Sequence, residues 1–509
     1  MTPLSLGRDR LNVLTIAAPG VLALVLALIQ IGDRSLWLDE GATIAIVSQH
    51  GSALWRAIAH DGGNMFGYYL LIHVIKVLFG TSLVLLRLPS ALADGATAAI
   101  VAAIALRLFK NRGIALSAGL LSAVSITLVY WGQDIRGYAL MATFGAAGWL
   151  ALIVLLDSEE LSKRALIAYA VCVVLSLYVG FDAILLIPAQ LLLVAAVPAW
   201  RARLRIVVGA LVAVALLSVP LLVLALERGS SQLFWVPPVS ASLLHQTSQA
   251  LTSSAYLPNF PARSVAVFLE VLTWLLLLVG LADRKRLRAE GAAALVPIAW
   301  LVIPAVLALI IALDGKPIEL QRSAVLLIPA VAIALAWVLH RPGLPRYRGV
   351  VGVVVLLALR AATLVPTYGV SPENWKAATA YVTSNGPACV AFYPQDGREP
   401  FQYYIRGRSM AGFTPILPTE AWAVVKPHVE QYLLGNPGLL AGITSRCARL
   451  YFIYSHNGQP NGPPQSRLNF QRFVRLERML VADYHGNSMT RSFGYAAAVN
   501  VQLFSAVRR

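Results

Sequence analysis

The chain of 509 residues is 58% hydrophobic and only 13% charged, whereas a typical soluble domain is about 45–50% apolar and about 25% charged. On a soluble protein, its formal net charge of +17 would suggest a nucleic-acid partner. Here the cations cluster at the ends of long apolar runs, which is the pattern that membrane topology sets. The composition therefore argues against nucleic acid and predicts an α-helical polytopic membrane protein.

Long apolar runs fill the chain up to residue 366, and a helix needs about 20 mostly apolar residues to cross a bilayer. The first run is too long for the apolar core of a signal peptide and lacks a clear small-residue cleavage site, so a retained span is expected. The stretch Phe66–Phe79 is apolar but short, which predicts an interfacial or re-entrant helix. About eleven spans are predicted, near 11–31, 87–107, 113–130, 138–156, 165–180, 182–199, 205–226, 264–282, 292–313, 322–339 and 349–366.

The short loops predict the orientation of these spans. With the N-terminus inside, every inside segment is basic, as the positive-inside rule requires. The outer face then holds the loops 32–86, 131–137, 227–263 and 314–321 and everything after 367. We expect the plasma membrane, with a cytoplasmic N-terminus and an extracytoplasmic C-terminal part.

The tail 367–509 is long enough for a core of its own, and it is predicted to form a soluble extracytoplasmic α/β domain separate from a transmembrane domain, 1–366. Strands are expected at Ala388–Tyr393 and Arg449–Tyr454, helices at Trp375–Thr383 and Thr419–Leu434, and a loop at Asn457–Pro464. Cys389 and Cys447 each lie just before or inside a predicted strand, so they could form a disulfide if this part is extracytoplasmic. The third cysteine, Cys172, lies in an apolar run and is expected to be a packing residue.

Two adjacent carboxylates, Asp39 and Glu40, follow the first predicted span. Charged groups near lipid are costly, and two interpretations stay open. Both acids could be solvated at the interface, with Trp37 as an interfacial anchor. Alternatively, they provide a general base or a cation ligand at the membrane surface. Burial would raise the pKa of such a carboxyl, and a nearby cation would lower it.

The next loop on the same face contains Asp134, Arg136 and Tyr138. Asp134 and Arg136 could form a pair that only helps the chain to turn. The functional alternative is that Arg136 holds an anionic group while Asp134 positions a substrate or a metal. Arginine suits phosphate because its planar guanidinium donates parallel hydrogen bonds.

The stretch around the predicted interfacial helix offers further candidates: Asn64, Tyr68, Tyr69, His73 and Lys76. Tyrosines at this depth are interface anchors or substrate contacts, and a lysine there either snorkels to the headgroups or binds phosphate.

A late outer loop adds Glu319 and Arg322 where it enters a span, from which Arg322 could reach the same cavity. The sequence has no P-loop, dinucleotide fingerprint or Gly-x-Ser-x-Gly motif, so nucleotide-driven chemistry is not supported.

Several of these motifs together resemble a known family over residues 30–145. The order of the motifs is similar to that in the GT-C membrane glycosyltransferases of the protein-mannosyltransferase and aminoarabinose-transferase type, glycosyltransferase family 39. The motifs are Leu36–Glu40, Tyr68–His73, Leu86–Ser90 and Gln133–Leu140. The chain departs from the family at Asn64–Gly67, where relatives carry His or Lys before Pro-Pro, and at Asp134–Arg136, where they usually carry Glu-Ala-Arg.

The resemblance implies a GT-C fold and an inverting transfer of a sugar from a polyprenyl-phosphate donor. Asp39 would be the general base, with Glu40 beside it, and Asp134 would orient the acceptor or the sugar. Arg136, Arg322 and Lys76 would neutralise the departing phosphate. Asn64, Tyr68, Tyr69, His73 and Tyr138 would line the substrate site.

Other questions stay open at this stage. The sugar could be of the mannose or arabinose type, and the acceptor a glycan, a glycolipid or a protein. A divalent cation is an open question. The alternatives to an enzyme are a lipid or glycolipid transporter, which would more often show inverted repeats and broken midplane helices, and an inactive scaffold, in which the acids should be replaced.

Overall fold

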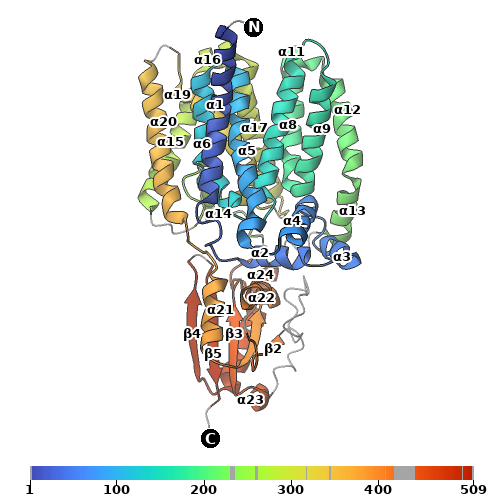
Figure 1. The fold of residues 1–509 in the computed structure, drawn as a ribbon, viewed down its shortest axis with the longest axis vertical. Coiled ribbons are helices and arrows are strands. Elements are labelled where there is room, and N and C mark those ends of the chain that lie inside the picture. The colour runs from blue at the N-terminus through green and yellow to red at the C-terminus, as the bar shows by residue number, and fades with distance from the viewer. Residues whose placement is uncertain are drawn as a thin grey trace.

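The computed structural model describes residues 3–229, 236–257, 262–316, 318–342, 345–406, 409–417, 442–495 and 497–506. A bundle of helices forms one end of the molecule, and a five-stranded sheet with its own helices forms the other (Figure 1). The N-terminus lies at the end of the bundle far from the sheet. We call the residues from 368 onward the C-terminal unit.

Six helices in the described residues are long and apolar enough to cross a membrane, and the number reaches nine if each of three bent helix pairs is one span. The protein is therefore a multi-pass membrane protein. The six helices are α1 (Pro3–Leu28), α5 (Leu83–Phe109), α8 (Tyr138–Asp157), α15 (Arg263–Ala282), α17 (Ala292–Leu313) and α20 (Arg346–Leu364).

Three predicted spans are bent rather than straight. α6 (Arg112–Ala123) meets α7 (Ile126–Gly132) at 56°, and α12 (Leu204–Leu217) meets α13 (Val219–Arg228) at 52°. α18 (Leu320–Ser323) with η3 (Ala324–Leu326) meets α19 (Ile328–Leu339) at 59°. Pro220 and Pro329 lie in the first turn after two of these bends, because proline lacks the N–H that would continue the preceding helix.

The prediction of about eleven spans exceeds the six to nine that length and composition support. The two extra segments are helical but short, namely α9 (Lys163–Val179) and η1 (Phe181–Leu185) followed by α10 (Leu186–Ala196). The chain breaks between them at Gly180, which packs so closely that a Cβ there would lie 2.4 Å from Met141 Sδ.

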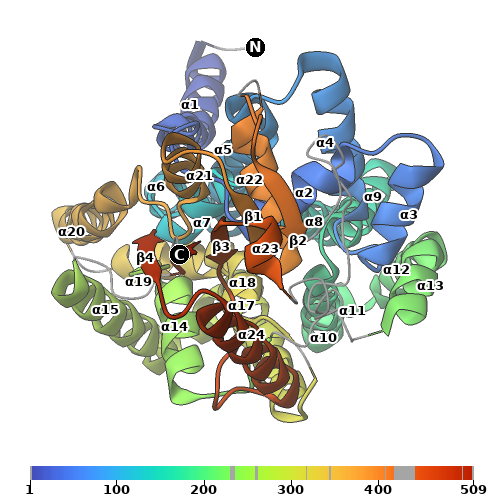
Figure 2. The ribbon, with the colours of Figure 1, turned by 90° about the horizontal axis from the view of Figure 1, so that it is seen from below.

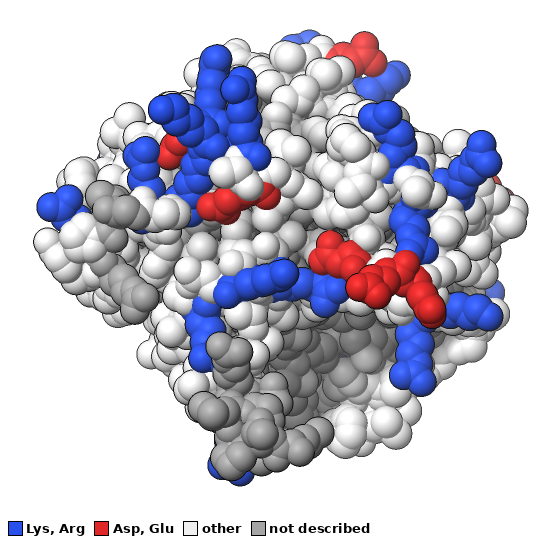
Figure 3. Space-filling model, turned by 90° about the horizontal axis from the view of Figure 1, so that it is seen from above, with Lys and Arg blue, Asp and Glu red and all other residues white. Residues whose placement is uncertain are grey.

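The two ends of the bundle differ in character. The end far from the sheet carries α11 (Pro198–Arg201) and α16 (Arg284–Glu290), and Lys and Arg predominate over Asp and Glu on this face (Figure 3). The end nearest the sheet carries α2 (Leu38–Val47), α3 (Ser52–His60), α4 (Phe66–Phe79) and α14 (Ala241–Thr252). α4 is the short apolar helix that the sequence predicts.

The C-terminal unit is built on a sheet of order β2-β1-β3-β5-β4, in which β1 is parallel to β2 and β3, and β5 is antiparallel to β3 and β4. Both strands and the first helix predicted there are present, but the predicted helix 419–434 lies outside the described residues. The strands are β1 (Cys389–Tyr393), β2 (Thr414–Leu417), β3 (Arg449–Tyr454), β4 (Ser488–Phe493) and β5 (Val499–Ser505), and the helices are α21 (Trp375–Ser384), α22 (Arg398–Ile405), α23 (Ile443–Arg446) and α24 (Pro464–Asp483).

A disulfide joins Cys389 to Cys447, whose Cα atoms are 5.8 Å apart. β1 and β3 are adjacent parallel strands, and Cys389 pairs with Leu450, three residues after Cys447. The sheet thus brings the two cysteines together. Cys172 is a free cysteine in α9.

Candidate active site

The C-terminal unit holds the loop that precedes α2, and α2 packs beside α22 (Figure 2). Gly41 touches this unit so closely that a Cβ there would lie 2.6 Å from Pro400 Cδ. The backbone N–H groups of Ser35, Leu36 and Leu38 donate to Ser371 Oγ (2.8 Å), the Tyr404 hydroxyl (2.7 Å) and Glu373 Oε2 (3.0 Å). The position of Asp39, the second residue of α2, is therefore set by both parts of the chain.

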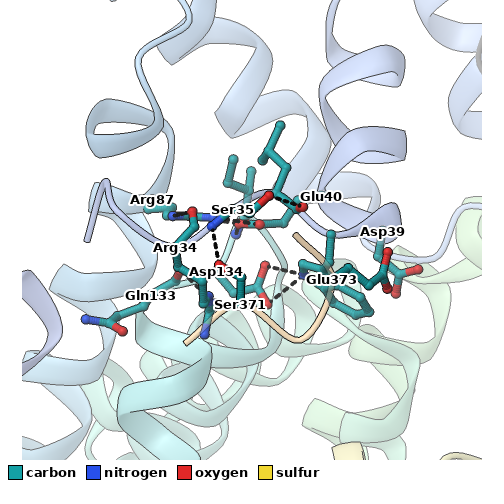
Figure 4. Close-up of polar contacts among 12 residues, drawn as sticks. Arg34, Ser35, Asp39, Glu40, Arg87, Gln133, Asp134, Ser371 and Glu373 are labelled. Atoms are coloured by element: carbon teal, nitrogen blue, oxygen red, sulfur yellow. Dashed lines mark hydrogen bonds and ion pairs between the residues drawn. The ribbon is translucent and has the colours of Figure 1, made fainter. Parts of the chain in front are cut away.

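Glu40 faces inward and forms a fully buried pair with Arg87 of α5 (Figure 4). The Arg87 Nε and NH2 groups donate to the two Glu40 oxygens at 2.8 and 2.7 Å, and neither side chain is exposed. The Ile135 N–H also donates to Glu40, at 2.9 Å. Burial raises the pKa of Glu40, but the neighbouring groups, Arg87 foremost and then Arg34, together outweigh burial, so the pKa is lowered. This pair ties α2 to α5 and to the α7–α8 turn.

Asp134 lies in that turn and is also fully buried. Its oxygens accept hydrogen bonds from the Trp37 indole at 3.1 and 3.0 Å, and one of them is 3.5 Å from Arg34 NH2. Burial and the nearby charge of Glu40 raise the pKa of Asp134, although Arg34 opposes this. We call Arg34, Glu40, Arg87 and Asp134 the buried cluster.

Asp39, next to Glu40 in the chain, lies on the other side of the loop (Figure 4). Its Oδ2 accepts from Arg322 NH1 at 2.9 Å and is 3.8 Å from Arg136 NH2, and its side chain is 27% exposed. Burial alone would raise the pKa of Asp39, but Arg322 and Arg136 hold it below its usual value. Asp39 is therefore an accessible carboxylate flanked by two guanidinium groups.

Arg322 stands at the start of α18, where the bent helix begins. Its Nε donates to Glu319 at 2.9 Å, its NH1 donates to the Tyr138 hydroxyl at 3.3 Å, and its guanidinium lies 5.1 Å from the Trp37 ring centre. Burial raises the pKa of Glu319 to about 7, although Arg322 opposes this. We call Asp39, Arg136, Glu319 and Arg322 the open cluster.

Arg136 is held from the opposite side by α2 and α4. Its NH1 donates to Thr43 Oγ1 at 3.3 Å and to the Tyr69 hydroxyl at 3.5 Å, and Tyr69 donates to Asp61 Oδ2 at 2.7 Å. Burial raises the pKa of Asp61 to about 6, against the effect of Arg136. Tyr69 and Tyr138 thus contact the two arginines from different helices.

The other residues predicted for the site surround this network, and the Tyr68 hydroxyl donates to the Asp134 carbonyl at 3.5 Å. Tyr68 is buried behind it, with its hydroxyl 3.2 Å from Ser90 Oγ. His73 Nδ1 is 2.8 Å from the Val47 carbonyl, which ties α4 to α2. Burial lowers the pKa of Lys76, and the nearby Arg406 lowers it further. Asn64 is half-buried on the turn before α4.

Two residues near Asp39 carry no sequence signal that predicts them. Glu373 precedes α21, and its Oε2 accepts from both Leu38 N and Trp375 Nε1. Its Oε1 is 2.6 Å from His456 Nε2, and His456 is close enough to Asp39 to help lower its pKa. Both come from the tail, far from the motifs of residues 30–145, so only the fold brings them to the site.

Within the described residues, no group of three or more His, Cys, Asp or Glu side chains could hold a metal ion, and Asp39 is already engaged by arginines. A small apolar cavity of about 200 Å³ adjoins the start of α18, and it is lined by Leu251, Trp274, Ala308, Leu320, Ser323 and Leu327 among others.

Comparisons with known proteins agree with this geometry at the level of the fold. No protein-family model and no curated protein sequence matches the chain. Among solved structures, ArnT from Cupriavidus metallidurans in the apo state has a TM-score of 0.58 at 14% identity, covering 98% of both chains. The chain has the GT-C fold. ArnT bound to undecaprenyl phosphate has a TM-score of 0.55 at 13% identity, over 96% of this chain and 97% of that one.

A third similar structure is the archaeal oligosaccharyltransferase AglB from Archaeoglobus fulgidus, in complex with an inhibitory peptide and a dolichol-phosphate. Its TM-score is 0.52 at 13% identity, and the match covers 96% of this chain and 74% of that one. At these identities the likeness concerns the fold, so the match to family 39 stays a prediction.

Proposed function

We propose that this protein is a glycosyltransferase that moves a sugar from a polyprenyl-phosphate donor to an acceptor hydroxyl at the outer face of the plasma membrane. The observation that carries the proposal is the open cluster, in which one accessible carboxylate, Asp39, lies between Arg136 and Arg322. A base beside two phosphate-binding cations is what a single displacement at a sugar phosphate needs. The GT-C fold, shared with ArnT and AglB, supports this assignment.

The reaction follows from these residues. Asp39 takes the proton of the acceptor hydroxyl while the acceptor oxygen forms a bond to the anomeric carbon. The bond between that carbon and the phosphate oxygen breaks, and the polyprenyl phosphate leaves with the electron pair. Arg136 and Arg322 balance the charge that develops on the phosphate, which lowers the barrier. Attack opposite the leaving group inverts the anomeric centre.

Arg322 couples donor binding to the strength of the base. Its NH1 is 2.9 Å from Asp39 Oδ2, and this contact helps to hold the pKa of that carboxyl below its usual value. A donor phosphate competes with Asp39 for the same guanidinium. Once Arg322 and Arg136 bind the phosphate, Asp39 loses part of its neutralisation and its pKa rises, so the base becomes effective when the donor is in place.

The buried cluster has a supporting role in this mechanism. Glu40 and Asp134 are fully enclosed, and their oxygens are taken by Arg87, Trp37 and backbone N–H groups. We assign them to positioning α2 and the α7–α8 turn, which carry Asp39 and Arg136. The cavity beside Leu320 and Ser323 is suited to the first units of a polyprenyl chain, because its lining is mostly apolar and these two residues flank Arg322 in the chain.

The test offers the purified full-length protein in nanodiscs a panel of radiolabelled polyprenyl-phosphate sugars, including mannose and arabinose types, with membrane lipids and cell-envelope glycans as acceptors. Consumption of one donor, with label moving to an acceptor or to water, supports a transferase and identifies the sugar. If no donor is consumed but labelled lipid crosses the bilayer of proteoliposomes, the protein is a transporter and the proposal fails.

A further inference from the structure

His456 is held in a strained position at the edge of the site. It lies in the loop between β3 and α24 with φ of +47°, in the left-handed region that non-glycine residues seldom adopt. Its carbonyl accepts from Asn469 Nδ2 of α24 at 3.2 Å, which helps to fix the loop. Strain of this kind persists where the surrounding structure enforces it, and it is concentrated at functional sites.

The ring of His456 is anchored on one side only. Nε2 is 2.6 Å from Glu373 Oε1, and Glu373 is almost fully buried. The other Glu373 oxygen accepts from Leu38 N and Trp375 Nε1, so the carboxylate cannot turn away. Within the residues that the structure describes, His456 Nδ1 has no hydrogen-bond partner, and 40% of the side chain is exposed.

Charge links this histidine to the base. Burial lowers the pKa of His456, but Glu373 and, to a smaller extent, Asp39 raise it above its usual value. Arg322 opposes this rise. Glu373 before α21 contacts the ring, and Asp39 on α2 and Arg322 on α18 are close enough for their charges to affect it. A carboxylate that fixes the ring and favours its proton leaves Nδ1–H as a donor for an incoming oxygen.

We propose that His456 is an acceptor-binding residue, whose Nδ1–H donates to an oxygen of the acceptor next to the hydroxyl that Asp39 deprotonates. This inference rests on the proposed transferase function. It assigns the contact to the acceptor because His456 belongs to the C-terminal unit, whereas Arg136 and Arg322 belong to the helical bundle. The bundle and the sheet form opposite ends of the molecule (Figure 1), so we expect a lipid-linked donor to enter from the bundle and a polar acceptor from the side of the sheet.

The first test compares wild type, H456A, H456Q and the control H485A, using the donor and acceptor pair that wild type consumes. His485 is an exposed histidine at the other end of α24. We expect H456A to raise the KM for acceptor about 10- to 100-fold, the size of a hydrogen bond from a charged donor. The KM for donor should stay near its wild-type value, and hydrolysis of the donor by water should change much less than transfer, because neither uses the acceptor. H485A should match wild type throughout.

The second measurement is the ratio of the transfer rate to the hydrolysis rate as a function of pH. A group whose titration affects both reactions equally does not change this ratio. In wild type the ratio should fall as pH rises through the pKa of His456, since deprotonation turns Nδ1 from a donor into an acceptor. E373Q should move this fall to lower pH, because it removes the charge that favours the imidazolium. H456Q, which keeps a neutral donor, should restore part of the transfer and remove the fall.

The outcomes separate the two proposals. If wild type consumes no donor, the transferase function fails, and this inference fails with it. If wild type is active but H456A leaves the KM for acceptor unchanged, the inference alone is wrong. An equal loss of hydrolysis and transfer in a folded H456A would place His456 at the donor and would also overturn it, as would a ratio that rises with pH.

Discussion

Asp39 and Glu40 are adjacent in the chain, yet they belong to two different environments. Glu40 belongs to the buried cluster, where each oxygen has a fixed donor and no side-chain surface is exposed. Asp39 belongs to the open cluster, where it is partly exposed between arginines. Two successive residues of a helix point in different directions, so one acid joins the helices, while the other is partly exposed, and we propose that it faces the substrate. A paired-acid motif need not contain two catalytic acids.

The largest expected effect is a loss of transfer activity on substitution of Asp39, which distinguishes it from Glu40. D39N should lower transfer about 10²–10⁴-fold, the usual contribution of a general base, with the apparent melting temperature nearly unchanged. The assay is label transfer from the donor identified in the panel. D157N, at the other end of the bundle in an exposed pair with Arg107, is the matched control and should keep wild-type activity. Full activity in D39N would remove the distinction between the clusters.

The reverse effect is expected for stability. E40A leaves the fully buried Arg87 without its carboxylate, and breaking a buried ion pair in this way costs about 3–5 kcal/mol. The matched control is R107A, which breaks the exposed pair with Asp157, where about 0–1 kcal/mol is expected. The measurement is the loss of folded protein on heating in detergent. Equal melting of E40A and R107A would contradict the assignment of Glu40 to support.

Replacing an arginine of the open cluster should slow the chemical step, but by less than the largest loss expected for D39N. R136A or R322A removes one donor to the developing phosphate charge, which typically lowers kcat about 10²–10³-fold. K76A serves as the comparison, because Lys76 lies near Arg406 and outside the contact network of Asp39. We expect a much smaller change in kcat for K76A. A loss equal to that of R136A would return Lys76 to the phosphate site.

The smallest expected effect concerns Asp61. Its pKa is raised to about 6 by burial, above the usual value of about 3.9. The folded state therefore binds more protons than the unfolded state between these values, and stability falls as pH rises through this window. D61N cannot titrate, so its melting temperature should not show this fall between about pH 4 and pH 6. Parallel profiles for wild type and D61N would show that Asp61 is not buried in this way.

Local patterns were sufficient to predict much of the fold. Long apolar runs mark the spans, α4 begins and ends where the sequence predicts, and β1 and β3 are visible as short apolar strands. Helix bends were not predicted, because a proline alone does not decide where a span bends: Pro297 and Pro304 lie inside the single helix α17. β4 is polar and exposed, and a polar edge strand has no apolar signal to find.

The candidate site was predicted only in part. Asp39, Arg136 and Arg322 do lie together. The sequence predicted this because the family motifs include the first two, and the predicted topology puts the loop before Arg322 on the same face. Sequence could not distinguish the environments of Asp39 and Glu40, because the partner Arg87 is a distant residue in a span. Glu373 and His456 were missed for the same reason, since they reach Asp39 only when the C-terminal unit packs against α2.

The most direct test of the central claim is the anomeric configuration of the first product, determined by NMR on the donor that the protein consumes. A single displacement, with Asp39 as base and the polyprenyl phosphate as leaving group, predicts inversion relative to the donor. Retention of configuration would require a glycosyl-enzyme intermediate and two displacements, and it would contradict the role of Asp39 proposed for this site.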